Sequence, residues 1–292
     1  MKPPRFAYAA PSSLEEALEL LGRYGGEAKV LAGGQSLMPL LNLRLVRPEV
    51  LVDVNRLPGQ DRIEERNGFL ELGMLVRHRQ AERSALVRER LPLLHEAVRQ
   101  IGHPQIRNRG TLCGSVAHAD PAAELPAVLT ALDGEVLLRS RSGRRALPAG
   151  EFFLGFLTTA LEPEELVEGI RLPVAPPRSG AAFVEFSRRA GDFALVGVAA
   201  QLTFAGDGSI AAAGLALTGV GAGPFKAAAA EESLRGQRPS ARLFAEVARQ
   251  VREAVEPEAD IHASAEYRRH LAEVLTRRAL ETAWRRAGLE AA

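Results

Sequence analysis

Two short glycine-rich segments in the first half of the chain most constrain its fold and its chemistry. In each, the sequence predicts an apolar strand that leads into a loop of glycine and hydroxyl residues, at residues 29–36 and again at 109–115. Because glycine has no Cβ atom, backbone N–H groups in such loops can approach an anion closely. Each segment ends in a serine, Ser36 or Ser115. Together they predict a ligand with several oxygen atoms, and a nucleotide pyrophosphate fits.

Each segment also has a simpler interpretation as a turn. Ser36 is then an ordinary N-cap of the apolar segment that follows it. Neither segment is the G-x-G-x-x-G fingerprint or a Walker P-loop. Asp120 and Glu124 either bind sugar hydroxyls or belong to a helix that begins at Pro121. His118 either faces the ligand or makes only local hydrogen bonds.

Composition narrows the class of protein. The chain has 292 residues, 46% hydrophobic and 25% charged, which suits a globular protein of one large or two ordinary domains. A net charge of +1 gives no electrostatic reason to expect nucleic acid or an anionic membrane as a partner. Cys113 is the only cysteine, so an internal disulfide and a four-cysteine zinc or iron–sulfur site are excluded. We expect a cytoplasmic protein without a signal peptide, because no apolar run approaches the roughly 18 residues of a membrane helix.

The predicted elements are those of an α+β protein. Helices are expected over residues 14–24, 92–102 and 121–132, and strands over 29–31, 50–54, 69–73 and 135–139. Pro173, Pro176 and Pro177 resist both helix and central strand, so a domain boundary is expected there. Beyond it, strands over 181–187, 195–204 and 210–220 suggest an antiparallel sheet, followed by helices over 241–255 and 264–286.

Several stretches resemble the FAD-binding medium subunits of molybdenum hydroxylases, in particular that of aerobic carbon monoxide dehydrogenase, with relatives in the xanthine dehydrogenase family. The stretches are residues 32–37 with Pro39 and Arg44, then 101–111, 188–194 and 260–269. The likeness spans almost the whole chain. It is the combination of these motifs that is specific, since either glycine segment alone is common.

The resemblance implies an α+β fold with an FAD-binding domain of the vanillyl-alcohol-oxidase (PCMH) type over residues 1–175. That domain has two subdomains, about 1–55 and 56–175. A smaller C-terminal domain of the carbon monoxide dehydrogenase flavoprotein type, with an antiparallel sheet and helices, takes residues 176–292. The implied cofactor is non-covalently bound FAD, and the implied binding residues are Ala32, Gly33, Gly34, Gln35, Ser36, Thr111, Leu112, Cys113, Gly114, Ser115, His118, Asp120, Glu124 and Phe193.

Within that set the resemblance implies separate roles. The two glycine segments hold the pyrophosphate, Asp120 and Glu124 face the ribityl chain, and Phe193 lies near the isoalloxazine ring. Cys113 departs from the family, which commonly has Gly-Gly-Asn or Gly-Gly-Ser at this point, and we expect its thiol to point near the cofactor. Phe193 lacks the hydroxyl group of a tyrosine, so no proton-donor role is assigned to it.

The implied function is electron transfer within a complex. An iron–sulfur small subunit would deliver electrons from a molybdenum-cofactor large subunit, and FAD on this chain would pass them to an external acceptor, in a dimer of heterotrimers. No metal ligands and no catalytic residue are expected in this chain, since its six histidines lack metal-site spacing. The alternatives are a stand-alone FAD-dependent oxidase or reductase and an assembly scaffold that has lost its flavin.

Overall fold

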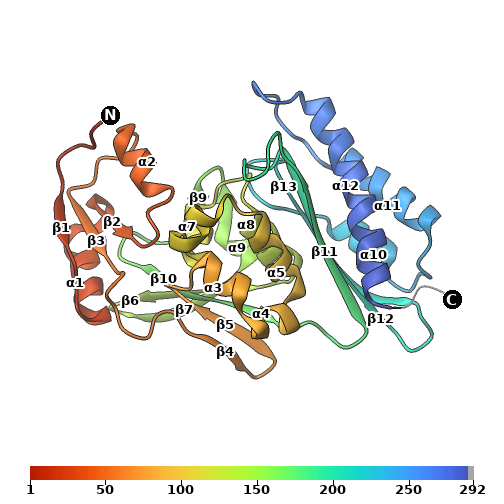
Figure 1. The fold of residues 1–292 in the computed structure, drawn as a ribbon, viewed down its shortest axis with the longest axis horizontal. Coiled ribbons are helices and arrows are strands. Elements are labelled where there is room, and N and C mark those ends of the chain that lie inside the picture. The colour runs from red at the N-terminus through yellow and green to blue at the C-terminus, as the bar shows by residue number, and fades with distance from the viewer. Residues whose placement is uncertain (289–292) are drawn as a thin grey trace.

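The computed structural model describes residues 1–288, in which three units follow one another along the chain (Figure 1). The first unit is a parallel sheet of order β1-β3-β2, flanked by helices. Its elements are β1 (Ala7–Ala9), α1 (Leu14–Tyr24), the 3₁₀-helix η1 (Gly25–Glu27), β2 (Ala28–Leu31), α2 (Leu37–Asn42) and β3 (Val50–Asp53). α1 begins where the sequence predicts, because the Ser13 hydroxyl accepts the N–H of Glu16 at 3.1 Å.

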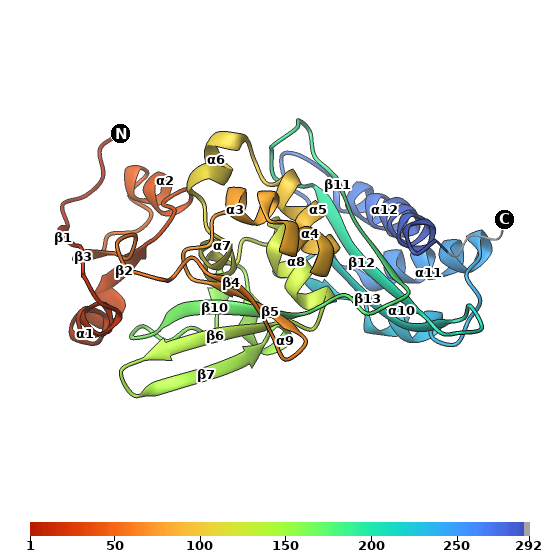
Figure 2. The same ribbon diagram turned by 60° about the horizontal axis from the view of Figure 1, so that its bottom comes forward.

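The second unit is a five-stranded antiparallel sheet of order β4-β5-β10-β6-β7. Helices α3 to α8 lie on one side of it (Figure 2). The strands are β4 (Ile63–Arg66), β5 (Phe69–Gly73), β6 (Glu135–Ser140), β7 (Gly143–Pro148) and β10 (Leu166–Pro173), with a small hairpin of β8 (Phe153–Gly155) and β9 (Thr158–Thr159). The helices are α3 (His78–Arg83), α4 (Ala85–Arg90), α5 (Pro92–Gln100), α6 (Pro104–Arg109), α7 (Leu112–His118), α8 (Glu124–Ala131) and α9 (Ala149–Phe152).

The third unit is the predicted antiparallel sheet, with order β11-β12-β13-β14. Its elements are β11 (Ser179–Phe186), β12 (Val196–Phe204), β13 (Ile210–Thr218), β14 (Phe225–Lys226), α10 (Ala228–Leu234), α11 (Ala241–Ala254) and α12 (Ala265–Arg286). One face of the sheet packs against α12, and the other packs against α5 and α8 of the second unit (Figure 1). The α+β class expected from the sequence is confirmed.

One hydrophobic cluster crosses the junction between the second and third units, and another lies between the sheet and the helices of the third unit. Phe183 of β11 and Ala199 of β12 belong to the same buried cluster as Leu93 of α5 and Val128 of α8. A separate cluster fills the first unit and includes Met74 and other residues from the start of the second. Among residues 1–288, no helix combines the length and apolar character that crossing a bilayer requires.

Two local predictions are wrong. No strand precedes the second glycine segment, because α6 lies there instead. The segment is also not a loop, because residues 112–118 form α7. The helix expected from Pro121 begins only at Glu124. Asp120 instead closes a turn by accepting the N–H of Ala122 at 2.9 Å, and the carbonyl of Pro121 accepts the hydroxyl of Thr218 at 2.6 Å.

Candidate functional site

The two glycine segments meet in the folded chain. A Cβ atom added to Gly33 would lie 2.6 Å from the carbonyl oxygen of Arg109 and 2.7 Å from Cα of Gly110. Real Cβ atoms do not come this close to backbone atoms, so only glycine fits at position 33. Gly34 adopts a left-handed φ of 72°, the other conformation that favours glycine. The sequence therefore placed glycine where the fold needs close backbone approach.

A hollow of about 300 Å³ opens beside this contact. It is lined by Leu31, Ala32, Gly33, Gly34, Gln35, Met38, Pro39, Asp53, Asn55 and Arg109. Within residues 1–288, the N–H groups of residues 33–36 donate to no other part of the chain. Three of these donors, at residues 33–35, line the hollow beside Arg109 and fit the negatively charged oxygens of a pyrophosphate.

Ser36 does not behave as an ordinary N-cap. It precedes α2, but its hydroxyl accepts no capping hydrogen bond, and Ser36 is not among the residues that line the hollow. Gln35 folds back, and its amide nitrogen donates to the carbonyl of Gly33 at 3.0 Å. The capping interpretation of Ser36 is therefore not supported by its geometry.

Three polar residues that line the hollow, Asp53, Asn55 and Arg109, are not among the predicted binding residues. The Asn55 amide donates to the carbonyl of Ala32 at 2.9 Å and to Asp53 at 2.6 Å. Tyr8 donates to the second oxygen of Asp53 at 2.6 Å. Partial burial works to raise the pKa of Asp53, but the hydrogen bonds from Tyr8 and Asn55 hold it below its usual range. The sequence signal that could have identified Asp53 and Asn55 is their place at the carboxyl end of the strand predicted over residues 50–54.

The second segment is the start of α7. The Thr111 hydroxyl is the N-cap and accepts the N–H of Gly114 at 3.1 Å. A Cβ atom on Gly114 would lie 2.6 Å from that hydroxyl, so the glycine protects the cap. Leu112 is buried in the core, whereas Gly114 is exposed and Ser115 half-exposed. Only part of this segment is therefore free to meet a ligand.

Cys113 does not point its thiol at a ligand site as expected. Its side chain is buried, with Sγ 3.7 Å from the carbonyl oxygen of Gly73. Burial raises the pKa of the thiol to about 12, so it stays protonated. In this structure Cys113 is a core residue, and only its backbone can contribute to binding.

The residues after α7 form a different environment. Glu124 is only 5% exposed, and His118 and Asp120 are half-exposed. Burial, with the negative charges of Glu185 and Asp120, raises the pKa of Glu124 to about 8. None of these residues lines the first hollow.

A second hollow, of about 250 Å³, lies where the second unit meets the third. Its walls include His103, Arg107, Glu185 and Gly191. One carboxylate oxygen of Glu185 is buried without a hydrogen-bond partner, and burial raises the pKa of Glu185 to about 7. Phe193, two residues beyond Gly191, is 61% exposed and lines neither hollow.

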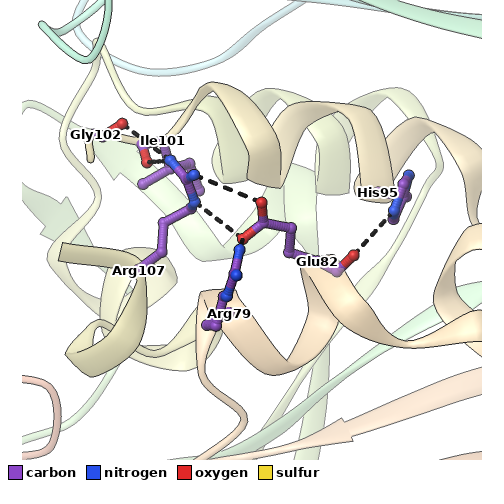
Figure 3. Close-up of polar contacts among 6 residues, drawn as sticks. All are labelled: Arg79, Glu82, His95, Ile101, Gly102 and Arg107. Carbon is purple, nitrogen blue, oxygen red and sulfur yellow. Dashed lines mark hydrogen bonds and ion pairs between the residues drawn. The ribbon is translucent and has the colours of Figure 1, made fainter. Parts of the chain in front are cut away.

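A buried ion pair fixes the turn that leads to the second glycine segment. Arg107 donates to the carbonyls of Ile101 and Gly102 at 2.9 and 3.0 Å and to Glu82 at 3.1 Å. Arg79 donates to the same carboxylate at 2.8 Å. Figure 3 shows both guanidinium groups directed at Glu82 from α6 and α3. All three nitrogens of the Arg107 guanidinium have an acceptor, so this side chain ties the turn to Glu82 of α3.

Both halves of the chain match known families. A family model described as the FAD binding domain in molybdopterin dehydrogenase matches residues 4–175. A second, described as the CO dehydrogenase flavoprotein C-terminal domain, matches residues 181–283.

The relatives cover nearly the whole chain. Subunit alpha of the 6-hydroxypseudooxynicotine dehydrogenase complex of Paenarthrobacter nicotinovorans is 42% identical, over 98% of this chain and 97% of the relative. The carbon monoxide dehydrogenase medium chain of Hydrogenophaga pseudoflava is 37% identical, over 98% and 99%.

Solved structures agree. Carbon monoxide dehydrogenase from Hydrogenophaga pseudoflava matches with a TM-score of 0.95 and 39% identity, over 98% of this chain and 99% of that chain. Quinoline 2-oxidoreductase from Pseudomonas putida 86 matches with a TM-score of 0.93 and 36% identity, over 98% and 99%. These relatives are complex subunits or medium chains, so the stand-alone alternative is not favoured. The chain belongs to the family of FAD-binding medium subunits of molybdenum hydroxylases, and it is an oxidoreductase subunit with an electron-transfer role.

Proposed function

We propose that FAD binds without a covalent bond in the hollow where the two glycine segments meet. The observation that supports this is the contact at Gly33, beside which three free N–H groups, those of residues 33–35, and Arg109 line one hollow. When bound, FAD supplies the redox chemistry, taking electrons from a partner subunit and passing them to an external acceptor. The chain itself binds and orients the cofactor.

Different residues would bind different parts of the cofactor. Ala32, Gly33, Gly34, Gln35 and Arg109 would hold the pyrophosphate from the first hollow. We propose that Ser36, Gly114 and Ser115 also contact the phosphates. The backbone of Thr111, Leu112 and Cys113 would lie beside them. His118, Asp120 and Glu124 would lie along the rest of the cofactor, toward Phe193 at the third unit.

We further propose that the chain works with an iron–sulfur small subunit and a molybdenum-cofactor large subunit, in a dimer of heterotrimers. The names of the relatives, which are complex subunits, support an assembly of this kind. The single, buried cysteine supports it too, because a flavin needs an electron donor and this chain cannot ligate an iron–sulfur cluster.

The remaining expectations are also proposals. We divide the chain into an FAD-binding domain over residues 1–175, with subdomains of about 1–55 and 56–175, and a C-terminal domain over 176–292. We also propose that the protein is cytoplasmic, and a chain without an internal disulfide agrees with that location.

Absorption spectroscopy tests the proposal. The purified chain should show flavin bands, and acid precipitation should release all the flavin into the supernatant. Flavin that stays on the denatured chain would show a covalent link, and a colourless chain that takes up no FAD would contradict the proposed function.

Activity measurements test the proposed partners. The isolated chain should oxidise no organic substrate and no carbon monoxide. Adding the two partner subunits should restore flavin reduction by substrate. Rapid substrate turnover by the chain alone, free of molybdenum, would favour a stand-alone flavoenzyme.

A further inference from the structure

Arg77 lies just before α3, and its backbone runs beside the second glycine segment. The residues on either side of it are tied to that segment: His78 donates its N–H to the carbonyl of Gly110, and Leu112 donates to the carbonyl of Val76, both at 3.0 Å. Arg77 itself forms an isolated antiparallel bridge with Thr111. The Arg77 backbone therefore has a fixed position relative to the second segment.

The side chain of Arg77 reaches the first segment as well. One guanidinium nitrogen donates to the carbonyl oxygen of Arg109, the atom that lies against Gly33. The other donates to the amide oxygen of Asn55 at 2.5 Å, and the same amide donates through its nitrogen to the carbonyl of Ala32 at 2.9 Å. One guanidinium group thus joins residues 109 and 32 across the hollow.

The guanidinium group of Arg77 is suited to holding two segments at a fixed distance. Arg77 is partly buried, and burial and then the positive charge of Arg109 lower its pKa, but a guanidinium remains charged. Its planar fork holds two acceptors at once in a fixed geometry, which the single ammonium group of a lysine cannot reproduce. Arg77 is not among the residues that line the hollow.

We propose that Arg77 is a positioning residue that sets the spacing between the two glycine segments and thereby the affinity for FAD. It acts through Arg109 on one side and through Asn55 on the other, without contact to the ligand. The inference rests on the proposed function, since it assigns FAD to the hollow between these segments.

The test is an FAD titration, by flavin fluorescence quenching, of the full chain stripped of cofactor. Arg77→Lys keeps the charge but loses the fork, so FAD should bind roughly tenfold or more weakly. Arg77→Gln should bind no better than Arg77→Lys. The matched control is Arg88→Lys on α4, since the Arg88 guanidinium lies 3.6 Å from Glu89 in an exposed ion pair. It should bind FAD within about twofold of the unchanged chain.

A double variant separates positioning from general destabilisation. Asn55→Ala alone should weaken FAD binding, and adding Arg77→Lys should cost little more, because both changes interrupt the same link. Fully additive losses would overturn the inference, as would unchanged affinity in Arg77→Lys. Failure of the unchanged chain to bind FAD would instead overturn the proposed function.

Discussion

Glu124 is a carboxyl group that the fold buries at the first residue of α8. Its pKa rises from an ordinary value of 4.5 to about 8 in the folded chain, so between these values the folded state binds a proton that the unfolded state has lost. Stability that is fully present below pH 4.5 is therefore lost as pH rises toward 8. The loss is at most about 1.4 kcal/mol per pH unit for one group.

Glu124→Gln should remove this part of the pH dependence. Without FAD, the free energy of unfolding of the unchanged chain should fall between pH 6.5 and 8.5 by on the order of 1 kcal/mol more than that of the variant. Urea unfolding at the two pH values measures the difference. Glu253→Gln, on the exposed side of α11, controls for the loss of one charge. An identical pH dependence in Glu124→Gln and the unchanged chain would contradict the account.

At the scale of elements, the hydroxyl groups of Ser36 and Thr111, one from each glycine segment, have different roles. Thr111 caps α7, whereas Ser36 makes no capping bond to α2. Thr111→Ala should therefore lower the stability of the FAD-free chain by about 1 kcal/mol, and Thr111→Ser should restore it. Ser36→Ala should leave that stability unchanged and weaken FAD binding by about 1 kcal/mol.

Thermal unfolding and FAD titration of the same three variants measure both effects. Equal destabilisation by Ser36→Ala and Thr111→Ala would mean that both hydroxyls are structural caps.

Local patterns predicted the longest helices and seven of the strands, but not α7, the start of α8 or the central strand β10. The Ser13 cap, the apolar spacing of α5 and the Gly-Asp-Gly turn between β12 and β13 are signals carried by neighbouring residues. α7 contains Gly114, a poor helix residue, and is supported by Leu112 donating to the distant Val76. α8 starts late because Thr218, almost a hundred residues away, binds the carbonyl of Pro121.

The sequence likewise predicted those parts of the site that depend on neighbouring residues, and not those that depend on distant ones. Glycine at 33 and 34 has a local signature, since close approach and left-handed φ exclude other residues. Arg77 and Asn55 have none, because their roles exist only once two separate segments come together. Cys113 was misplaced for a related reason: α7 turns its side chain into the core.

At the scale of the whole molecule, an ion pair joins α5 to the end of α12. Arg286 donates to both oxygens of Glu96, at 2.5 and 2.9 Å, and to the carbonyl of Ala181 at 2.8 Å. Glu96 also accepts the N–H of Phe183 at 3.0 Å. The carboxylate thus links the second unit to the sheet and the last helix of the third.

Glu96→Ala should lower the free energy of unfolding by about 1–3 kcal/mol, because it leaves the N–H of Phe183 without its acceptor. Glu246→Ala, which breaks the exposed pair with Arg242, should stay within about 0.5 kcal/mol of the unchanged chain. Urea unfolding compares the two. A loss in Glu96→Ala no larger than in the control would show that this ion pair does not stabilise the junction.

The central claim is that FAD binds where the two glycine segments meet, and Gly33→Ala tests it most directly. The new Cβ would lie within 2.7 Å of backbone atoms of Arg109 and Gly110, so the segments must separate. In a fluorescence titration, Gly33→Ala should bind FAD at least about tenfold more weakly than the unchanged chain. Gly26→Ala, whose added Cβ meets nothing within 4 Å, should bind normally. Unchanged affinity in a folded Gly33→Ala chain would place FAD elsewhere.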